Sequence, residues 1–238
     1  AYRGVKAAPE QVVIGAGSEY LLHLIVLLLG RDRVYAVEDP GYEKTRSILA
    51  GSARVRPLPL DEEGLRIDAL RGSDASVIHV TPSHHFPLGM VMPVSRRMEL
   101  LTYLNEGDRY LIEDDYDSEF RFSGRPIPSM QGMDDRERVI YFNTFAKSLA
   151  PSLRISYMVL PPHLLEVFHQ KFRLYASTVP SFEQLTLQRF MAGGHFERHL
   201  NRMRKQYRLR RDALIQALKD NGLTSILTLS GQEAGLHL

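Results

Sequence analysis

Short β-branched runs alternate along this chain with helical patterns, and this alternation limits its possible folds more than any other feature of the sequence. Strands that follow one another through helices pair in parallel, because a parallel connection needs a long crossover. We therefore predict an α/β protein with a mostly parallel sheet and helices on both faces. The predicted strands are 11–15, 33–38, 53–58, 76–81, 110–113, 139–143 and 155–160. The predicted helices are 18–29, 42–50, 95–106, 161–175, 182–192 and 195–220.

Length and composition exclude several classes of protein. The 238 residues are 44% hydrophobic and 24% charged and include no Cys, which is typical of a globular protein in a compartment without disulfides, and we expect the cytoplasm. The longest apolar run, 20–29, is interrupted by His23 and is shorter than the ~20 residues of a membrane span. The chain opens with no cleavable signal pattern. A net charge of +2 is too small to imply a nucleic-acid surface by itself.

The pattern changes near residue 190, and we expect two domains. Residues 1–190 form the first, and residues 191–238 form a linking helix and the beginning of a truncated small domain. The long helix 195–220 is basic, but its Arg and Lys residues spread around the helix without aromatic stacking partners, which does not favour nucleic-acid binding. After Asn221-Gly222 a β-rich pattern restarts at 225–229, which predicts a new strand.

A glycine-rich turn runs into the first predicted helix at GAGSEYLLHL, residues 15–24. Free backbone N–H groups and the positive end of the helix dipole would bind a phosphate there. A purely structural role also fits, since many glycine turns start helices. Glu19 places a carboxylate near the expected phosphate, which is unfavourable unless that side chain turns away.

An acidic run follows a buried strand in LIEDDYDSEFRF, residues 111–122. A carboxylate without a partner is costly to bury, so Asp114 at the strand end needs solvent or a cation. A protonated pyridine nitrogen would be such a cation. Taken alone, this segment favours an exposed acidic loop or a Mg²⁺ site.

The segment NTFAKSLAPSLRISY, residues 143–157, holds Lys147, the single lysine between Lys44 and Lys171. A lysine amine can lose its proton and attack a carbonyl, whereas a guanidinium stays protonated. Arg154 follows after a proline turn and has the geometry to grip a phosphate through two hydrogen bonds. The alternative for this pair is a surface lysine beside an arginine in an ion pair.

The order of these features resembles the fold type I pyridoxal-phosphate proteins, the aspartate aminotransferase superfamily. The resemblance covers essentially the whole chain and implies an aminotransferase-like large domain that binds pyridoxal 5'-phosphate as an internal aldimine on Lys147. Asp114 would keep the pyridine nitrogen protonated and Tyr116 would hydrogen-bond the ring hydroxyl, while Tyr42, after Pro-Gly, would stack on the ring. The phosphate would be held by Arg154, Thr144 and the backbone of Gly17, Ser18 and Glu19.

Within that superfamily the chain is most similar to MocR-type transcription regulators of the GntR superfamily, which join a winged-helix DNA-binding domain to an aminotransferase-like domain. At 81–89 an ordinary aminotransferase has an Asn-Pro-Thr-Gly element, but here Phe86 precedes Pro87, so the asparagine's bond to the ring hydroxyl would be missing. His84 or His85 would line the pocket instead, or be satisfied within the loop. The similarity rests on VEDPGY (37–42), TPSHHFPLG (81–89), IEDDYDSEFRF (112–122), NTFAKSLAPSLRISY (143–157) and GHFERHLNRMRKQYRLRRDAL (194–214).

The resemblance implies an effector-sensing domain rather than an enzyme. An amino compound would exchange with Lys147, and the change would be relayed to DNA through an N-terminal winged-helix domain that we expect to be absent from this chain. The resemblance also implies a head-to-tail homodimer, with no metal site and no membrane partner. A pyridoxal-phosphate-dependent aminotransferase is the alternative, with a residual half-reaction left open, and a cofactor-free interaction domain is a third. The sequence does not identify the effector.

Overall fold

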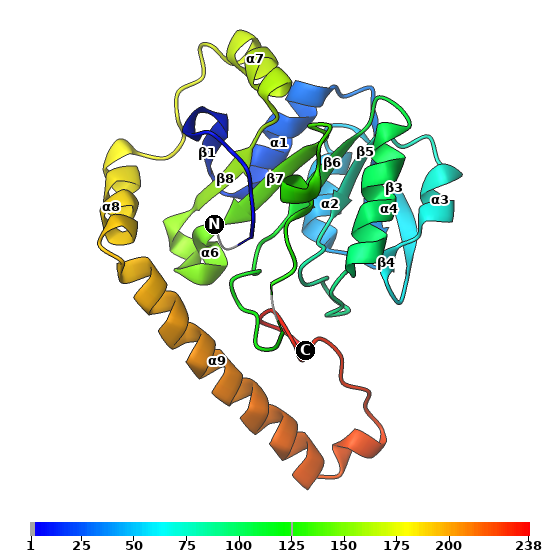
Figure 1. Ribbon diagram of the computed structural model, residues 1–238, viewed down its shortest axis with the longest axis vertical. Coiled ribbons are helices and arrows are strands. Elements are labelled where there is room, and N and C mark those ends of the chain that lie inside the picture. The colour runs from blue at the N-terminus through cyan, green and yellow to red at the C-terminus, as the bar shows by residue number, and fades with distance from the viewer. Residues whose placement is uncertain (1–2, 125) are drawn as a thin grey trace.

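An eight-stranded mixed sheet forms the centre of the computed structural model, which describes residues 3–124 and 126–238 (Figure 1). Its strand order is β1-β8-β7-β6-β5-β2-β3-β4. The strands are β1 Val12–Ala16, β2 Val34–Asp39, β3 Arg54–Asp61, β4 Gly64–Leu65, β5 Val77–Val80, β6 Tyr110–Asp114, β7 Val139–Thr144 and β8 Ile155–Val159. The helices are α1 Ser18–Leu29, α2 Glu43–Ala50, α3 Ile67–Arg71, α4 Val94–Asn105, α5 Met130–Met133, α6 Phe145–Ser148, α7 Pro162–Lys171, α8 Ser181–Ala192 and α9 His195–Asp220.

Five neighbouring strands, β3, β2, β5, β6 and β7, run parallel, as the alternating pattern predicted. The sequence did not predict that β8 turns back beside β7, or that β1 pairs antiparallel with β8. In this register Thr144 lies opposite Ser156, and Ala16 lies opposite Ile155. The end of β1, the end of β7 and the start of β8 therefore meet at one edge of the sheet.

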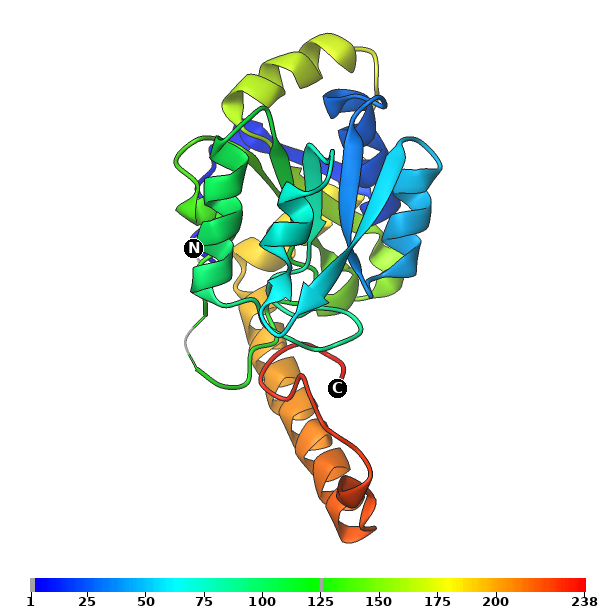
Figure 2. The same cartoon turned by 90° about the vertical axis from the view of Figure 1, so that its right-hand side faces the viewer.

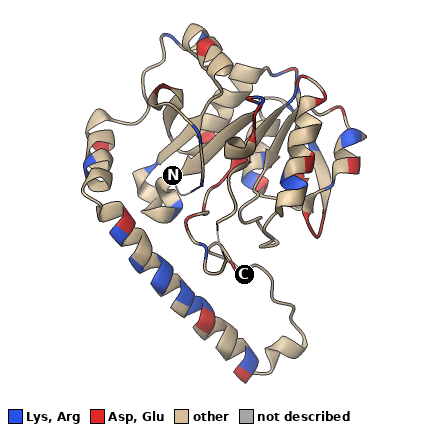
Figure 3. Ribbon diagram, in the orientation of Figure 1, with Lys and Arg blue, Asp and Glu red and all other residues tan. Residues whose placement is uncertain are grey.

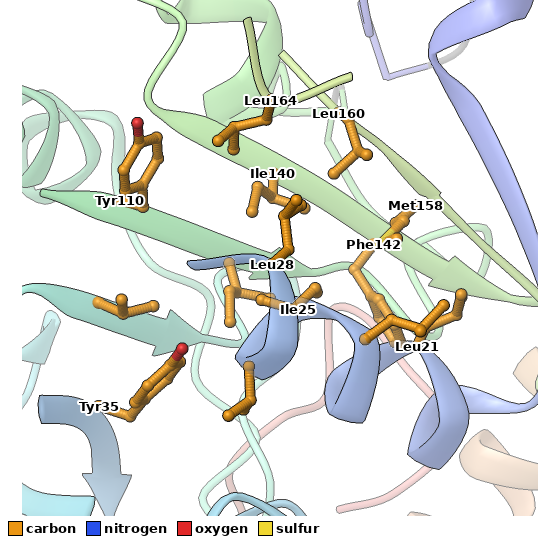
Figure 4. Close-up of a cluster of buried hydrophobic side chains, with 14 of the residues drawn as sticks. Leu21, Ile25, Leu28, Tyr35, Tyr110, Ile140, Phe142, Met158, Leu160 and Leu164 are labelled. Carbon is orange, nitrogen blue, oxygen red and sulfur yellow. The ribbon is translucent and has the colours of Figure 1, made fainter. Parts of the chain in front are cut away.

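Helices cover both faces of the sheet, so the prediction of a layered α/β fold is confirmed (Figures 1 and 2). On one face α1 buries its apolar side chains, among them Leu21 and Ile25, against Phe142 and Met158 of the sheet (Figure 4). On the other face α4 packs Leu100 and its neighbours against the sheet. Burial of each such side chain stabilises the fold by about 1.5–3 kcal/mol, which fixes the sheet that carries the site.

The long helix α9 contacts the rest of the protein mainly through its first turns. Phe196 and Leu200 are buried in a small cluster with Phe120, and the later turns extend away from the sheet (Figures 1 and 2). Lys and Arg residues are spread along this helix (Figure 3). None of the described helices has the length and apolar character needed to cross a membrane.

Two predicted elements differ from the structure, and three short helices were not predicted. Helix α7 ends at Lys171 rather than at 175, where the chain turns before α8. The strand predicted at 225–229 is wrong: that segment follows a 3₁₀ turn at Leu223–Ser225 and forms no strand. Nearby, Ala234 makes one isolated bridge with Arg121. The short helices α3, α5 and α6 were not predicted, because four or five residues are too few to show a helical period.

Candidate functional site

All the predicted site residues lie at one edge of the sheet. Tyr42 follows β2, His85 follows β5, and Asp114 ends β6. Lys147 lies in α6 directly after β7, and Gly17 joins β1 to α1. The ends of parallel strands are where open α/β sheets bind ligands, because the connecting loops converge there. The structure therefore brings into one region segments that are up to 137 residues apart along the chain, from 17 to 154.

The predicted phosphate end consists of the start of α1 and the residue that precedes β8. Gly17 has a φ of 95°, and a Cβ at this position would overlap the guanidinium of Arg154 and lie 2.7 Å from Oε2 of Glu19. Only glycine allows this close approach without strain. Thr144 caps α6, its hydroxyl oxygen accepting from the backbone N–H of Ala146 at 3.2 Å. Ser18 opens α1 at the same turn.

The side chain of Glu19 points toward the predicted phosphate end and not away from it. Its Oε2 accepts a hydrogen bond from Nη2 of Arg154 at 2.8 Å, and its Oε1 accepts one from Nζ of Lys44. Partial burial would raise the pKa of Glu19, but the bonds from Lys44 and Arg154 outweigh it and lower the pKa to about 2. The carboxylate thus stays ionised at neutral pH and holds the two cations nearest the start of α1.

Asp114, at the end of β6, has a carboxylate oxygen whose hydrogen-bonding capacity is unsatisfied among the described residues. Its Oδ1 is buried without a hydrogen-bond partner in the described chain, and its Oδ2 lies 3.4 Å from Nε2 of His79. Nearly all buried polar atoms in native proteins are hydrogen-bonded. A carboxylate oxygen left open in this way fits a donor supplied by a ligand.

Lys147 is exposed at the last turn of α6 and has no hydrogen bond or ion pair with any residue that the structure describes. Burial and then the charges of His84 and Lys147 lower the pKa of His237. A lysine free of partners at this edge is available for reaction with a ligand.

The aromatic and histidine residues predicted around the ring differ in exposure. Tyr42 is 52% exposed and contacts Phe86 edge-on, with ring centroids 5.6 Å apart. The hydroxyl of Tyr116 donates to the backbone carbonyl of His84 at 2.8 Å, so the loop already uses its proton. His85 is buried, and burial followed by the charges of His237 and His84 lowers its pKa to about 4. Its imidazole is therefore neutral at pH 7.

Sequence reasoning missed two buried groups beside Asp114. Glu38, near the end of β2, accepts hydrogen bonds from the backbone and hydroxyl of Thr81 at 3.0 and 2.8 Å and lies 3.6 Å from Nε2 of His85. His79 lies within β5. The signal was present, because each is a polar residue inside an otherwise apolar strand.

Comparison with known proteins agrees with this arrangement. A family model described as aminotransferase class I and II matches residues 1–232. The chain belongs to this family. It is similar to the kynurenine aminotransferase of Pyrococcus horikoshii, solved in complex with PMP, KYN and KYA, with 32% identity and a TM-score of 0.78 over 87% of this chain and 54% of that one. The fold type I architecture implied by the sequence is thereby confirmed.

The curated relatives of this family member include transcription regulators. It is 44% identical to YdeL of Bacillus subtilis (strain 168), an uncharacterized HTH-type transcriptional regulator, over 99% of this chain and 51% of the relative. It is 38% identical to MocR of Rhizobium meliloti, a probable rhizopine catabolism regulatory protein, over 100% of this chain and 48% of the relative. The resemblance to MocR-type regulators is thus confirmed, and the chain spans about half the length of these relatives.

Proposed function

We propose that this chain is the cofactor- and effector-binding part of a MocR-type transcription regulator. The observation that carries the proposal is the open Oδ1 of Asp114, at the same sheet edge as the cationic start of α1 and as Lys147, which has no partner among the described residues. These groups match the three ends of pyridoxal 5'-phosphate: a pyridine nitrogen, an aldehyde and a phosphate. The similarity to regulators over nearly the whole chain supports a sensing role.

Different residues would bind different parts of the cofactor. Asp114 accepts from the protonated ring nitrogen, and Arg154, Thr144 and the N–H groups that open α1 hold the phosphate. Pyridoxal phosphate would supply an aldehyde that condenses with a primary amine with release of water, and Lys147 would provide that amine. An amino compound could take the place of Lys147, and a few kcal/mol of differential binding would be enough to shift a two-state equilibrium.

The wider organisation is part of the same proposal. Residues 1–190 form the cofactor-binding domain, and 191–238 form the linking helix and the beginning of a C-terminal small domain. DNA binding belongs to a winged-helix domain outside this chain, in a cytoplasmic protein. We also propose a head-to-tail homodimer, because large apolar side chains are exposed near α7 and α8, and such surfaces mark interfaces. Leu174 is 88% exposed and Phe182 is 70% exposed. Sedimentation of the intact protein as a monomer at micromolar concentration would contradict the dimer.

The decisive experiment changes Lys147 in the intact protein. Lys147→Arg keeps the positive charge but cannot condense with an aldehyde, so the visible absorption band of the bound cofactor and the response of DNA binding to effector should both disappear. Lys205→Ala, which removes an exposed lysine of α9, is the control and should keep both. An undiminished band and response in Lys147→Arg would refute the proposal.

A second candidate function is aminotransferase catalysis, favoured by the similarity to the Pyrococcus horikoshii enzyme. The two functions share most of the site. A single-turnover assay separates them: an enzyme converts the aldehyde form of the cofactor completely to its amine form with a suitable amino acid, whereas a sensor binds the amino compound and leaves most of the cofactor as the aldehyde.

A further inference from the structure

A second cavity lies beside the cofactor edge, between the sheet and the start of α9. Its volume is about 370 Å³, within the range of small-molecule sites. Phe196 and Leu200 of α9 form an apolar wall, while Tyr141 and Asn143 of β7 and Glu119 form a polar floor. None of the residues assigned above to the cofactor lines this cavity.

A chain of hydrogen bonds runs along the floor. Asp115 accepts from Nε of Arg3 at 2.9 Å and from the hydroxyl of Tyr141 at 2.7 Å. The side-chain amide of Asn143 donates to the hydroxyl of Tyr141 at 3.2 Å and to Oε1 of Glu119 at 3.3 Å. The chain therefore leads from a buried ion pair to the carboxyl group of Glu119.

The chain of bonds ends in an acceptor without a donor. Oε2 of Glu119 is buried and has no hydrogen-bond partner among the described residues. Arg3 does not supply one, because its donors serve Asp115, Ser83 and the carbonyl of Ile127. Burial, and next to it the charge of Asp115, raises the pKa of Glu119 to about 7. In its ionised form this carboxylate lacks a donor at Oε2, and a cation would supply the donor and balance the negative charge.

We propose that this cavity is a second ligand site, which binds a small primary amine with an apolar body. The ammonium group pairs with Glu119, and the apolar body packs on Phe196 and Leu200. The occupant contacts both the sheet and α9, so it ties the position of that helix to ligand concentration. Because Lys147 takes no part in this site, the proposal stands independently of cofactor binding.

The test uses 2-phenylethylamine as the probe and isothermal titration calorimetry on the intact protein. The Lys147→Ala variant serves as the background, so that no amine is captured covalently at the cofactor edge. We expect saturable binding with one probe per chain. Glu119→Gln in that background should weaken binding at least tenfold. Glu197→Gln removes an exposed carboxylate from the rim of the same cavity and should change binding less than twofold.

The pH dependence of probe binding is an independent test of the proposal. A carboxyl group with a pKa of about 7 is roughly one-tenth ionised at pH 6 and nine-tenths ionised at pH 8, so affinity should rise about tenfold over this interval. The rise should vanish in Glu119→Gln. The titratable and charged groups around this carboxyl are Asp115 and Asp117 from its own loop, Arg3 from the N-terminal segment, Tyr141 and Tyr157 from the sheet, and Glu197 and Arg204 from α9.

Three results would overturn the proposal. They are absence of saturable binding at millimolar probe, equal binding by Glu119→Gln, and a crystal soaked with probe that shows only water at Glu119. Should Glu119→Gln fail to fold, Asn201→Trp replaces it. Asn201 is an exposed rim residue, and the indole should block entry and weaken binding at least tenfold while leaving the floor intact.

Discussion

The guanidinium of Arg154 donates a hydrogen bond of 2.8 Å to the carboxylate of Glu19 at the start of α1. The arginine proposed to hold the cofactor phosphate therefore already holds an anion. Lys44 donates to the same carboxylate. A dianionic phosphate that binds here has to share or displace Glu19, which opposes binding by like-charge repulsion.

Glu19→Gln should tighten cofactor binding by about three- to tenfold, because it removes that repulsion and leaves two cations for the phosphate. Stability should change by only about 0–1 kcal/mol, since the ion pairs are largely exposed. A titration of the cofactor-free protein with pyridoxal phosphate, followed by absorbance, measures the effect. Glu43→Gln is the control, because Glu43 is an exposed glutamate of α2 paired with Arg46. Weaker binding by Glu19→Gln would mean that Glu19 positions Arg154 rather than competing for it.

Gly17→Ala should weaken cofactor binding at least tenfold, because the added Cβ meets the guanidinium of Arg154 and displaces it. Gly17 has φ 95° and ψ 165°, a conformation that essentially only glycine adopts, so alanine there adds about 1–3 kcal/mol of destabilisation. Gly222→Ala separates the two effects, since Gly222 has a φ of 69° and no atom lies within 4 Å of the position that an alanine Cβ would take. Gly222 is in the αL conformation, so that control should lose about 1 kcal/mol of stability in thermal unfolding and bind cofactor normally. Equal cofactor affinity in the two variants would exclude the steric explanation.

Asp114→Asn should lower cofactor affinity about 10- to 100-fold, because a charge-assisted hydrogen bond to the ring nitrogen is worth about 1.5–3 kcal/mol. The visible absorption band should also change, since a neutral amide no longer favours the protonated ring. Asp39→Asn is the control, because Asp39 is an exposed aspartate at the end of neighbouring β2. Unchanged affinity in Asp114→Asn would show that its open oxygen serves another partner.

Glu38→Gln should change how stability depends on pH. Burial raises the pKa of Glu38 from 4.5 to about 7, so the folded protein holds more protons than the unfolded chain between these values. Its contribution to the free energy of unfolding therefore falls as pH rises through that window, and glutamine removes this fall. Relative to the native protein, the variant should gain on the order of 2 kcal/mol between pH 5 and pH 8. Urea unfolding across this range measures it, with exposed Glu62→Gln as the control. A pH-independent difference would contradict the buried, protonated carboxyl.

The sequence alone predicted the elements whose signals are local. Helices α1 and α9 begin and end where the periodicity placed them, because an amphipathic repeat is written into consecutive residues. The predicted strand at 225–229 failed for the opposite reason. A β-branched run becomes a strand only where a neighbouring strand takes its backbone hydrogen bonds, and residue types do not state whether that neighbour is present.

In the candidate site too, some features could be predicted from the sequence and others only from the structure. The order of the turn at Gly17, the acidic strand end at Asp114 and the amine at Lys147 was readable from residue types and predicted strand ends. The pairing of Glu19 with Arg154, the buried Glu38 and the open oxygen of Glu119 was decided only by the tertiary structure. Each depends on which distant side chain faces the group and on how much water is excluded, and these follow from the packing of strands and helices rather than from neighbours along the chain.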